Sequence, residues 1–187
     1  MGAASSIHVA LLRGINVGGN NIIPMAALAQ CFTAMKFAPV KTFIASGNVI
    51  FGAPKQDLRR LEIKIEKALV KAFDYDAKVV VKSKGELDAI VAGIAKAWGK
   101  PSESMRYYVM FLRHAIDNKR VLAQLDAKPG VETLTYVPGA LLWAANKSEL
   151  TKSTVAKKML AKAIYQEITV RNLNTTLKLA ELMAAAG

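Results

Sequence analysis

The chain has 187 residues, of which 52% are hydrophobic and 21% are charged. This ordinary globular composition excludes an intrinsically disordered protein, and a chain of this length can bury about 70% of the surface that it exposes when unfolded. The formal charge of +12, from 26 basic and 14 acidic residues, favours partners that carry negative charge, through a field that salt weakens.

The single cysteine, Cys31, excludes an internal disulfide and fits a reducing compartment. It lies among apolar residues at helical spacing, so we expect it in the core rather than at a catalytic site.

No apolar run approaches the roughly 18 residues that a membrane-spanning helix needs. We therefore expect a cytoplasmic protein without a membrane partner. The sequence does not indicate an oligomeric state.

The first half of the chain predicts alternating strands and helices. Residues 7–12 form a short apolar run typical of a buried strand, and Pro24 fits the first position of a helix. Residues 40–51 predict two strands joined by a two-residue hairpin at Gly47 and Asn48. The remaining elements of this half are a helix over 57–73, a strand within 77–83, and a further helix that begins after Ser83.

The second half begins after Gly99 and Pro101, which end that helix and open a polar linker. The patterns that follow predict a strand over 106–113, a short helix capped by Asp117, hairpin strands over 131–137 and 140–144, a helix over 153–165, a strand over 168–170, and a closing helix over 173–186 capped by Asn172.

Both halves read β-α-β-β-α-β, which is the ferredoxin-like split unit. The predicted fold class is α+β, with two tandem ferredoxin-like units, antiparallel sheets and additional helices. The predicted domains are residues 1–98 and 99–187. One local repeat agrees with this division, since VALLR at 9–13 and VMFLR at 109–113 occupy the same position in their halves.

The loop after the first strand is the main candidate site. In a split unit the end of the first strand and the following hairpin share one edge of the sheet. Glycines allow backbone N–H groups to converge, asparagine supplies amide donors, and arginine offers a fork to carboxylate or phosphate. The candidate residues for binding a small anion are Arg13, Gly14, Asn16, Gly18, Gly19, Asn20, Ser46, Gly47 and Asn48.

A structural interpretation of the same loop stays open, because glycine and asparagine are the commonest turn residues and Arg13 can bond to neighbouring carbonyls. No cofactor is predicted, because the glycine spacing gives neither a P-loop nor GxGxxG. His8 and His114 are the only histidines, and no spacing of Cys, Asp or Glu around them predicts a metal site. No catalytic residue can be assigned, since GxSxG is absent around Ser46.

Two helices are rich in basic residues, which leaves a nucleic-acid-binding module as the alternative function. The cations are Arg60, Lys64, Lys67 and Lys71 in one helix, and Lys152, Lys157, Lys158 and Lys162 in the other. A solvated helix face explains such a pattern equally well. The aromatic string with which an RNA-recognition motif stacks bases is absent, and the first strand contains no aromatic residue.

Three segments resemble a bacterial family called domain of unknown function 1697. They are LRGINVGG at 12–19, SGNVIF at 46–51 and TVRNLNT at 169–175. The resemblance implies a cytosolic protein built from ferredoxin-like units, and it implies no activity or cofactor. It also draws attention to Arg171, Asn172 and Thr175 as secondary candidates, although Asn172 and Thr175 also suit the start of a helix.

The leading hypothesis is a protein that binds a phosphate- or carboxylate-bearing ligand at the loop after the first strand, with Arg13 as the charged partner. Acylphosphatases share the ferredoxin-like topology and hold phosphate in the corresponding connection, so hydrolysis of an activated phosphate is the reaction that this analogy suggests. Whether the chain is an enzyme stays open at this point.

Overall fold

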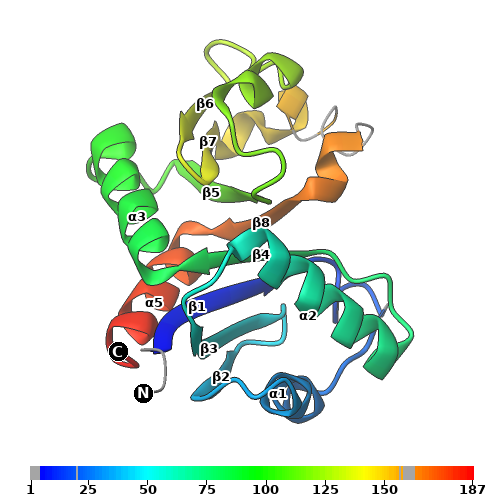
Figure 1. Ribbon diagram of the computed structural model, residues 1–187. Helices are drawn as coiled ribbons and strands as arrows, with labels where there is room; N and C mark the ends of the chain where they lie inside the picture. The colour runs from blue at the N-terminus through cyan, green and yellow to red at the C-terminus, as the bar shows by residue number, and fades with distance from the viewer. Residues whose placement is uncertain (1–4, 20, 156, 158–162) are drawn as a thin grey trace. The chain divides into compact units, whose positions relative to one another are not determined.

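The computed structural model describes residues 5–19, 21–155, 157 and 163–187 (Figure 1). It has an α+β architecture with two four-stranded antiparallel sheets. The chain divides into two compact units: unit 1 is Met1–Gly85 with Lys178–Gly187, and unit 2 is Glu86–Leu177. This division differs from the predicted boundary at residue 98. Residues 86–98, predicted in the first domain, belong to unit 2, and residues 178–187, predicted in the second, belong to unit 1. The periodicity of a helix identifies its buried face, but it does not specify which sheet that face packs against.

Unit 1 contains one sheet with the strand order β2-β3-β1-β4. Its elements are β1 (Ser5–Leu12), α1 (Met25–Ala34), β2 (Val40–Phe43), β3 (Asn48–Pro54), α2 (Leu58–Phe73) and β4 (Val79–Ser83). Both β1 and β2 pair antiparallel with β3, so they run parallel to each other, as predicted. Pro24 is the residue before α1 rather than its first residue, and the side chain of Asp57 caps α2 by accepting from Arg60 N at 2.8 Å.

The core of unit 1 lies between its sheet and the helices α1 and α2, which cover the same face of that sheet (Figure 1). Leu28 and Phe32 are the buried residues of α1, and their spacing places them on one side of the helix. Phe51 of β3 meets Phe32 and Phe37, with ring centroids 5.2 and 4.8 Å apart. This side of α1 is therefore its packing surface against the sheet.

The hairpin between β2 and β3 differs from the prediction of a two-residue turn at Gly47 and Asn48. Phe43 pairs with Asn48, so the loop has four residues, Ile44 to Gly47. Asn48 is the first residue of β3 and is fully buried. Its side-chain amide donates to Phe43 O at 2.9 Å and so closes the loop. Gly47 has a φ of 80°, and a Cβ at this position would lie 2.7 Å from Ile15 Cδ1.

Unit 2 has the corresponding strand order, β6-β7-β5-β8. The remaining elements of the chain are α3 (Lys84–Trp98), β5 (Met105–Leu112), the 3-10 helix η1 (Lys119–Gln124), β6 (Glu132–Val137), β7 (Ala140–Asn146), the 3-10 helices η2 (Lys147–Lys152) and η3 (Ala163–Glu167), β8 (Ile168–Asn172) and α5 (Leu173–Ala184). The hairpin at Pro138 and Gly139 is the predicted two-residue turn, with Val137 paired to Ala140.

In unit 2, the predicted cap at Asp117 is wrong, and part of the predicted helix over 153–165 lies outside the described residues. Asn118, not Asp117, caps η1. Asp117 instead accepts from Tyr136 Oη at 3.0 Å and Gly139 N at 2.9 Å, and burial together with this carboxylate raises the pKa of Tyr136 to about 12. The predicted helix over 153–165 includes residues 156 and 158–162, which lie outside the described residues, and the described part of the chain continues with η3.

The two units repeat the same backbone geometry at the end of their central strands. Leu12 N donates to Gly47 O at 2.8 Å, and Leu112 N donates to Gly139 O at 3.0 Å. In the neighbouring ladder, Val9 lies opposite Lys82 and Val109 lies opposite Arg171. Each residue of β1 therefore has a structural counterpart in β5 at its own number plus 100.

A buried carboxylate organises the core of unit 2. Glu132 is 4% exposed, and its two oxygens accept hydrogen bonds from Trp143 Nε1 (2.9 Å), Ser153 Oγ (2.5 Å), Lys128 N (3.2 Å), Thr154 N and Oγ1 (both 2.9 Å) and Val155 N (3.1 Å). Burial by itself would raise the pKa of Glu132, but these donors outweigh it and lower the pKa from 4.5 to about 2. The carboxylate ties three segments of unit 2 together.

We predict that Glu132→Gln destabilises unit 2 by about 3 kcal/mol at pH 7, because a pKa lowered to about 2 corresponds to this much stability in the ionised form. The contribution is complete above about pH 4.5 and is lost as the pH falls toward 2, so the difference between wild type and variant should vanish there. Urea unfolding monitored by tryptophan fluorescence at several pH values measures this, because Trp98 and Trp143 both belong to unit 2. Glu149→Gln, which removes a partly exposed ion pair with Lys152, is the control and should cost less than about 1 kcal/mol.

We predict that Gly47→Ala lowers the free energy of unfolding by about 2 kcal/mol or more, because the substitution combines a positive φ with overlap against Ile15 and Leu12. Gly19→Ala is the matched control, since Gly19 has a φ of 77° and nothing lies within 4 Å of its added Cβ. Denaturant unfolding of both variants separates overlap from backbone strain. Equal costs for the two variants would contradict the proposed packing of the hairpin against the loop.

Candidate functional site

The loop after β1 is fixed at its start by two backbone contacts of Arg13. Arg13 N donates to Lys78 O at 3.0 Å, and Arg13 O accepts from the hydroxyl of Tyr75. Burial raises the pKa of Tyr75, and the positive charge of Arg13 opposes this shift. The guanidinium of Arg13 therefore stabilises negative charge near Tyr75, at the end of β1, where burial reduces screening by water.

Asn16 closes the loop with its side chain. Its Nδ2 donates to Ile23 O at 3.0 Å and to Ala45 O at 2.9 Å, while its Oδ1 accepts from Ile23 N at 2.8 Å. These bonds use both amide hydrogens within the protein. They favour the structural interpretation for Asn16, whose side chain joins the loop to the hairpin.

The hairpin lies directly against this loop, as its predicted position at the same sheet edge requires. Gly47 packs on Ile15, and its carbonyl oxygen accepts from Leu12 N. The Asn48 amide donates to Ser46 Oγ at 3.2 Å as well as to Phe43 O. Asn48 is therefore a buried residue of the hairpin, and Ser46 is the member of this group that is partly exposed.

The exposed part of the loop consists of glycines and apolar side chains. Gly14, Gly18 and Gly19 have φ values of 70°, 61° and 77° and are exposed to solvent. Because Gly18 and Gly19 carry no side chain, nothing on these two residues shields their backbone N–H groups. Val17 and Ile22 are 60% and 75% exposed beside them. Asn20, the remaining candidate, lies outside the described residues.

The secondary candidates belong to unit 2, and the structure gives them separate roles. Arg171 is 9% exposed, its Nη1 donates to Val170 O at 2.8 Å, and burial lowers its pKa to about 10. Asn172 Oδ1 accepts from Thr175 N at 2.8 Å. The expectation that Asn172 and Thr175 form a helix start is therefore confirmed, with α5 as the helix.

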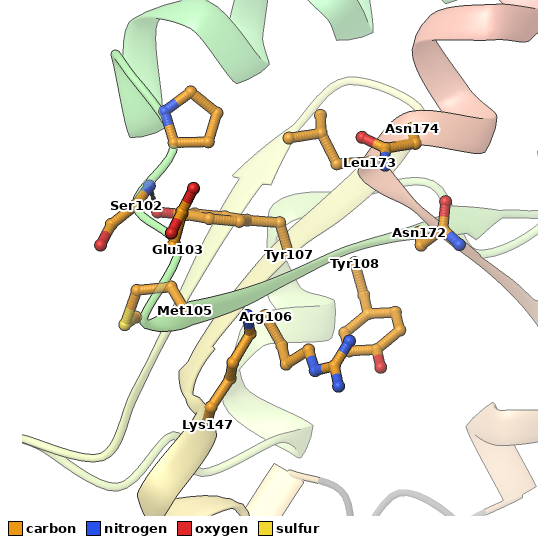
Figure 2. Close-up of a pocket in the computed structure, with 11 residues that line it drawn as sticks. Ser102, Glu103, Met105, Arg106, Tyr107, Tyr108, Lys147, Asn172, Leu173 and Asn174 are labelled. Atoms are coloured by element: carbon orange, nitrogen blue, oxygen red, sulfur yellow. Dashed lines mark hydrogen bonds between the residues drawn. The ribbon is translucent and has the colours of Figure 1, made fainter.

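A cavity of about 400 Å³ opens in unit 2 beside the start of β5 (Figure 2). Arg106 and Lys147 contribute its cations, and Asn172, Leu173 and Asn174 contribute the wall from the start of α5. The sequence analysis did not single out Arg106 or Lys147. Nothing in the pattern could indicate them, because they are ordinary surface cations 41 positions apart that the β5–β7 pairing brings together.

The described residues contain no group of three or more His, Cys, Asp or Glu side chains placed to hold a metal ion. His8 is 2% exposed and stacks on Phe51, and His114 Nε2 lies 2.9 Å from Glu86 Oε1. Burial raises the pKa of the Cys31 thiol. Across the same part of the chain, no helix combines the length and the apolar character that crossing a membrane requires.

Comparison with known proteins identifies a family without an assigned activity. No protein with a curated functional description matches the chain. The solved structure of the conserved bacterial protein SP0830 from Streptococcus pneumoniae is similar, with 26% sequence identity, a TM-score of 0.83, and coverage of 96% of this chain and 99% of that chain. The model of a family described as protein of unknown function, DUF1697, matches residues 6–143. The chain therefore belongs to the DUF1697 family, as its LRGINVGG, SGNVIF and TVRNLNT segments led us to expect.

Proposed function

We propose that this protein binds a small phosphate- or carboxylate-bearing ligand at the loop after β1. The observation that carries the proposal is the left-handed pair Gly18 and Gly19, exposed on a loop that begins at Arg13 and is fastened to the hairpin through Asn16. With glycine at both positions, an anion can approach the backbone N–H groups without side-chain obstruction. A fastened loop loses little conformational entropy on binding.

Charge adds to these backbone donors. Arg13 follows β1 directly and carries a permanent positive charge, and its planar fork can bond a phosphate or carboxylate through two parallel N–H groups. Ser46, on the adjoining hairpin, adds a hydroxyl. The ligand-binding set that we propose is therefore Arg13, Gly14, Gly18, Gly19 and Ser46, with Asn16, Gly47 and Asn48 holding the loop and the hairpin in position.

The reaction that such a site suits is hydrolysis of an acyl phosphate. The oxygen of water bonds to phosphorus while the bond from phosphorus to the acyl oxygen breaks, which releases a carboxylate and inorganic phosphate. The developing negative charge would be stabilised by the backbone N–H groups and the guanidinium. The strand orders β2-β3-β1-β4 and β6-β7-β5-β8 support a ferredoxin-like topology for each unit, and this topology underlies the analogy with acylphosphatases.

One observation favours the alternative, nucleic-acid binding. Arg59, Arg60, Lys64, Lys67 and Lys71 are all exposed on α2. Against it, the aromatic side chain that meets this face, Phe37, is 3% exposed and lies under Lys64 at 4.9 Å, so it cannot stack on a base. A cationic face without an accessible stacking platform binds phosphate backbones weakly and loses this affinity in salt.

We predict that inorganic phosphate shifts the backbone amide resonances of Gly18 and Gly19 in the ¹⁵N-labelled protein. Arg13→Gln should raise the dissociation constant about tenfold, because it removes one charge-assisted interaction. Arg13→Lys, which keeps the charge but not the fork, should lose less. Circular dichroism of each variant checks that the fold is retained. Phosphate binding that leaves these glycines unshifted would refute the site.

We predict that the purified protein hydrolyses acetyl phosphate and that Arg13→Gln reduces kcat/KM by at least about tenfold, because the guanidinium would stabilise charge that develops at the transferring phosphoryl group. Release of inorganic phosphate is the measurement.

For the alternative function, a Lys64→Glu, Lys67→Glu variant should lose binding to a duplex oligonucleotide at low salt. Oligonucleotide affinity that survives physiological salt in the wild type would favour the alternative.

A further inference from the structure

We propose that unit 2 carries a second ligand site, the cavity of about 400 Å³ beside the start of β5, and that its ligand is a nucleoside monophosphate or a phosphorylated metabolite of that size. This site is distinct from the loop after β1, because all of its lining residues belong to unit 2. Four observations support it: a gap in the sheet, a concentration of positive charge, a wall suited to an organic group, and a comparison between the two units.

The gap arises because β8 is shorter than β5. β8 ends at Asn172 opposite Tyr108, whereas β5 begins three residues earlier, at Met105. The register would place Leu173 opposite Tyr107, but Leu173 already begins α5. The cavity is lined by Met105, Arg106, Tyr107 and Tyr108. Since consecutive side chains of a strand point to opposite faces, four consecutive lining residues place the cavity at the open edge of β5.

The backbone of β5 also faces this gap. Leu112 bonds to β7 through Gly139, and Arg113 N bonds to Glu167 O beside β8. In an antiparallel ladder these directions alternate along the strand, so the even residues of β5 face β7 and the odd residues face β8. The N–H and C=O groups of Tyr107 therefore point toward the side of β5 on which β8 has ended.

Positive charge gathers around the cavity from three elements. Arg106 projects from β5, and Lys147 follows the end of β7 (Figure 2). Asn172 to Asn174 contribute the N-terminal end of α5, a 12-residue helix without an acidic residue in its first turn. A helix N-terminus carries partial positive charge. Figure 2 shows Arg106 and Lys147 on one side of β5 and the start of α5 on the other, so the two cations suit a phosphate group while the helix end adds positive charge to the opposite wall.

The remaining wall suits an organic group with hydroxyls. Tyr108 stacks on Trp143, with ring centroids 5.1 Å apart and planes inclined by 22°, which holds its ring in place. Leu173 and Met105 add apolar surface. Glu103 also lines the cavity and is exposed, and its carboxylate can accept hydrogen bonds from sugar hydroxyls. A volume of about 400 Å³ falls within the range of small-molecule sites and accommodates a mononucleotide.

A comparison with the equivalent place in unit 1 shows that the fold does not require a cation at the position of Arg106. In unit 1, β4 ends at Ser83 opposite His8 and α3 begins at the next residue, which is the same arrangement as in unit 2. The counterpart of Arg106 is Ser6, and the counterpart of Tyr107 is Ile7. A Cβ on Gly187 would lie 3.7 Å from Ile7, so the chain end packs there in unit 1. Lys55 is the counterpart of Lys147, which leaves Arg106 as the cation that distinguishes unit 2.

The test is a titration of the full ¹⁵N-labelled chain with adenosine monophosphate, adenosine and inorganic phosphate, followed by NMR. We expect adenosine monophosphate to shift the amide resonances of Tyr107 and Asn174, adenosine to bind more weakly because it lacks the phosphate, and Arg106→Ala to raise the dissociation constant of adenosine monophosphate about tenfold. Lys147→Ala should act in the same direction. Arg106 and Lys147 are exposed, so neither substitution threatens folding.

Lys55→Ala is the matched control and should leave the affinity unchanged, because Lys55 holds the same position in unit 1. The proposal is overturned if adenosine monophosphate leaves the resonances of Tyr107 and Asn174 unshifted, or if Arg106→Ala and Lys55→Ala bind it equally well. Shifts confined to Gly18 and Gly19 would refute this second site while supporting the site at the loop after β1. Shifts confined to Tyr107 and Asn174 would do the reverse.

Discussion

The hydrogen bonds at the end of each central strand hold the candidate site in place. In unit 1, Leu12 N bonds to Gly47 O at 2.8 Å and Arg13 N bonds to Lys78 O at 3.0 Å, so one short segment joins the hairpin on one side to the chain before β4 on the other. A strand that is paired on both sides cannot shift without breaking two ladders. The residue after it must therefore leave the sheet at a defined point, and that residue is Arg13.

This constraint separates the residues that hold the loop in place from those that are exposed on it. Asn16 and Asn48 use their amides within the protein, and Gly47 provides the close contact with Ile15. The glycines at 18 and 19 extend beyond these contacts and are exposed. Under our proposal, this support means that the loop does not first have to order itself when it binds an anion.

The two units keep one strand order but stabilise their cores differently. Unit 1 uses an aromatic cluster around Phe51, whereas unit 2 surrounds the Glu132 carboxylate with hydrogen-bond donors, among them Trp143. The starts of their central strands differ as well, since β5 has Arg106 at the position that Ser6 holds in β1. A repeated fold allows such divergence because the backbone ladder supports the strand whichever side chain projects from its open edge. We therefore propose that the two halves bind different ligands.

The sequence by itself determined the eight strands, the longer helices of the described residues, and their order. The period of the apolar residues located α2 and the strands, and Asn172 marked the start of α5, because these features depend on neighbours within a few residues. The placement of the glycine loop beside the hairpin also followed, since the handedness of the crossover leaves one arrangement. Only the tertiary structure decided the four-residue hairpin loop, the bonding of Asp117 to the β6–β7 turn, the buried Glu132, and the meeting of Arg106 with Lys147. Each of these depends on contacts between distant segments, whose free energies outweigh local preference and leave no periodic trace in the chain.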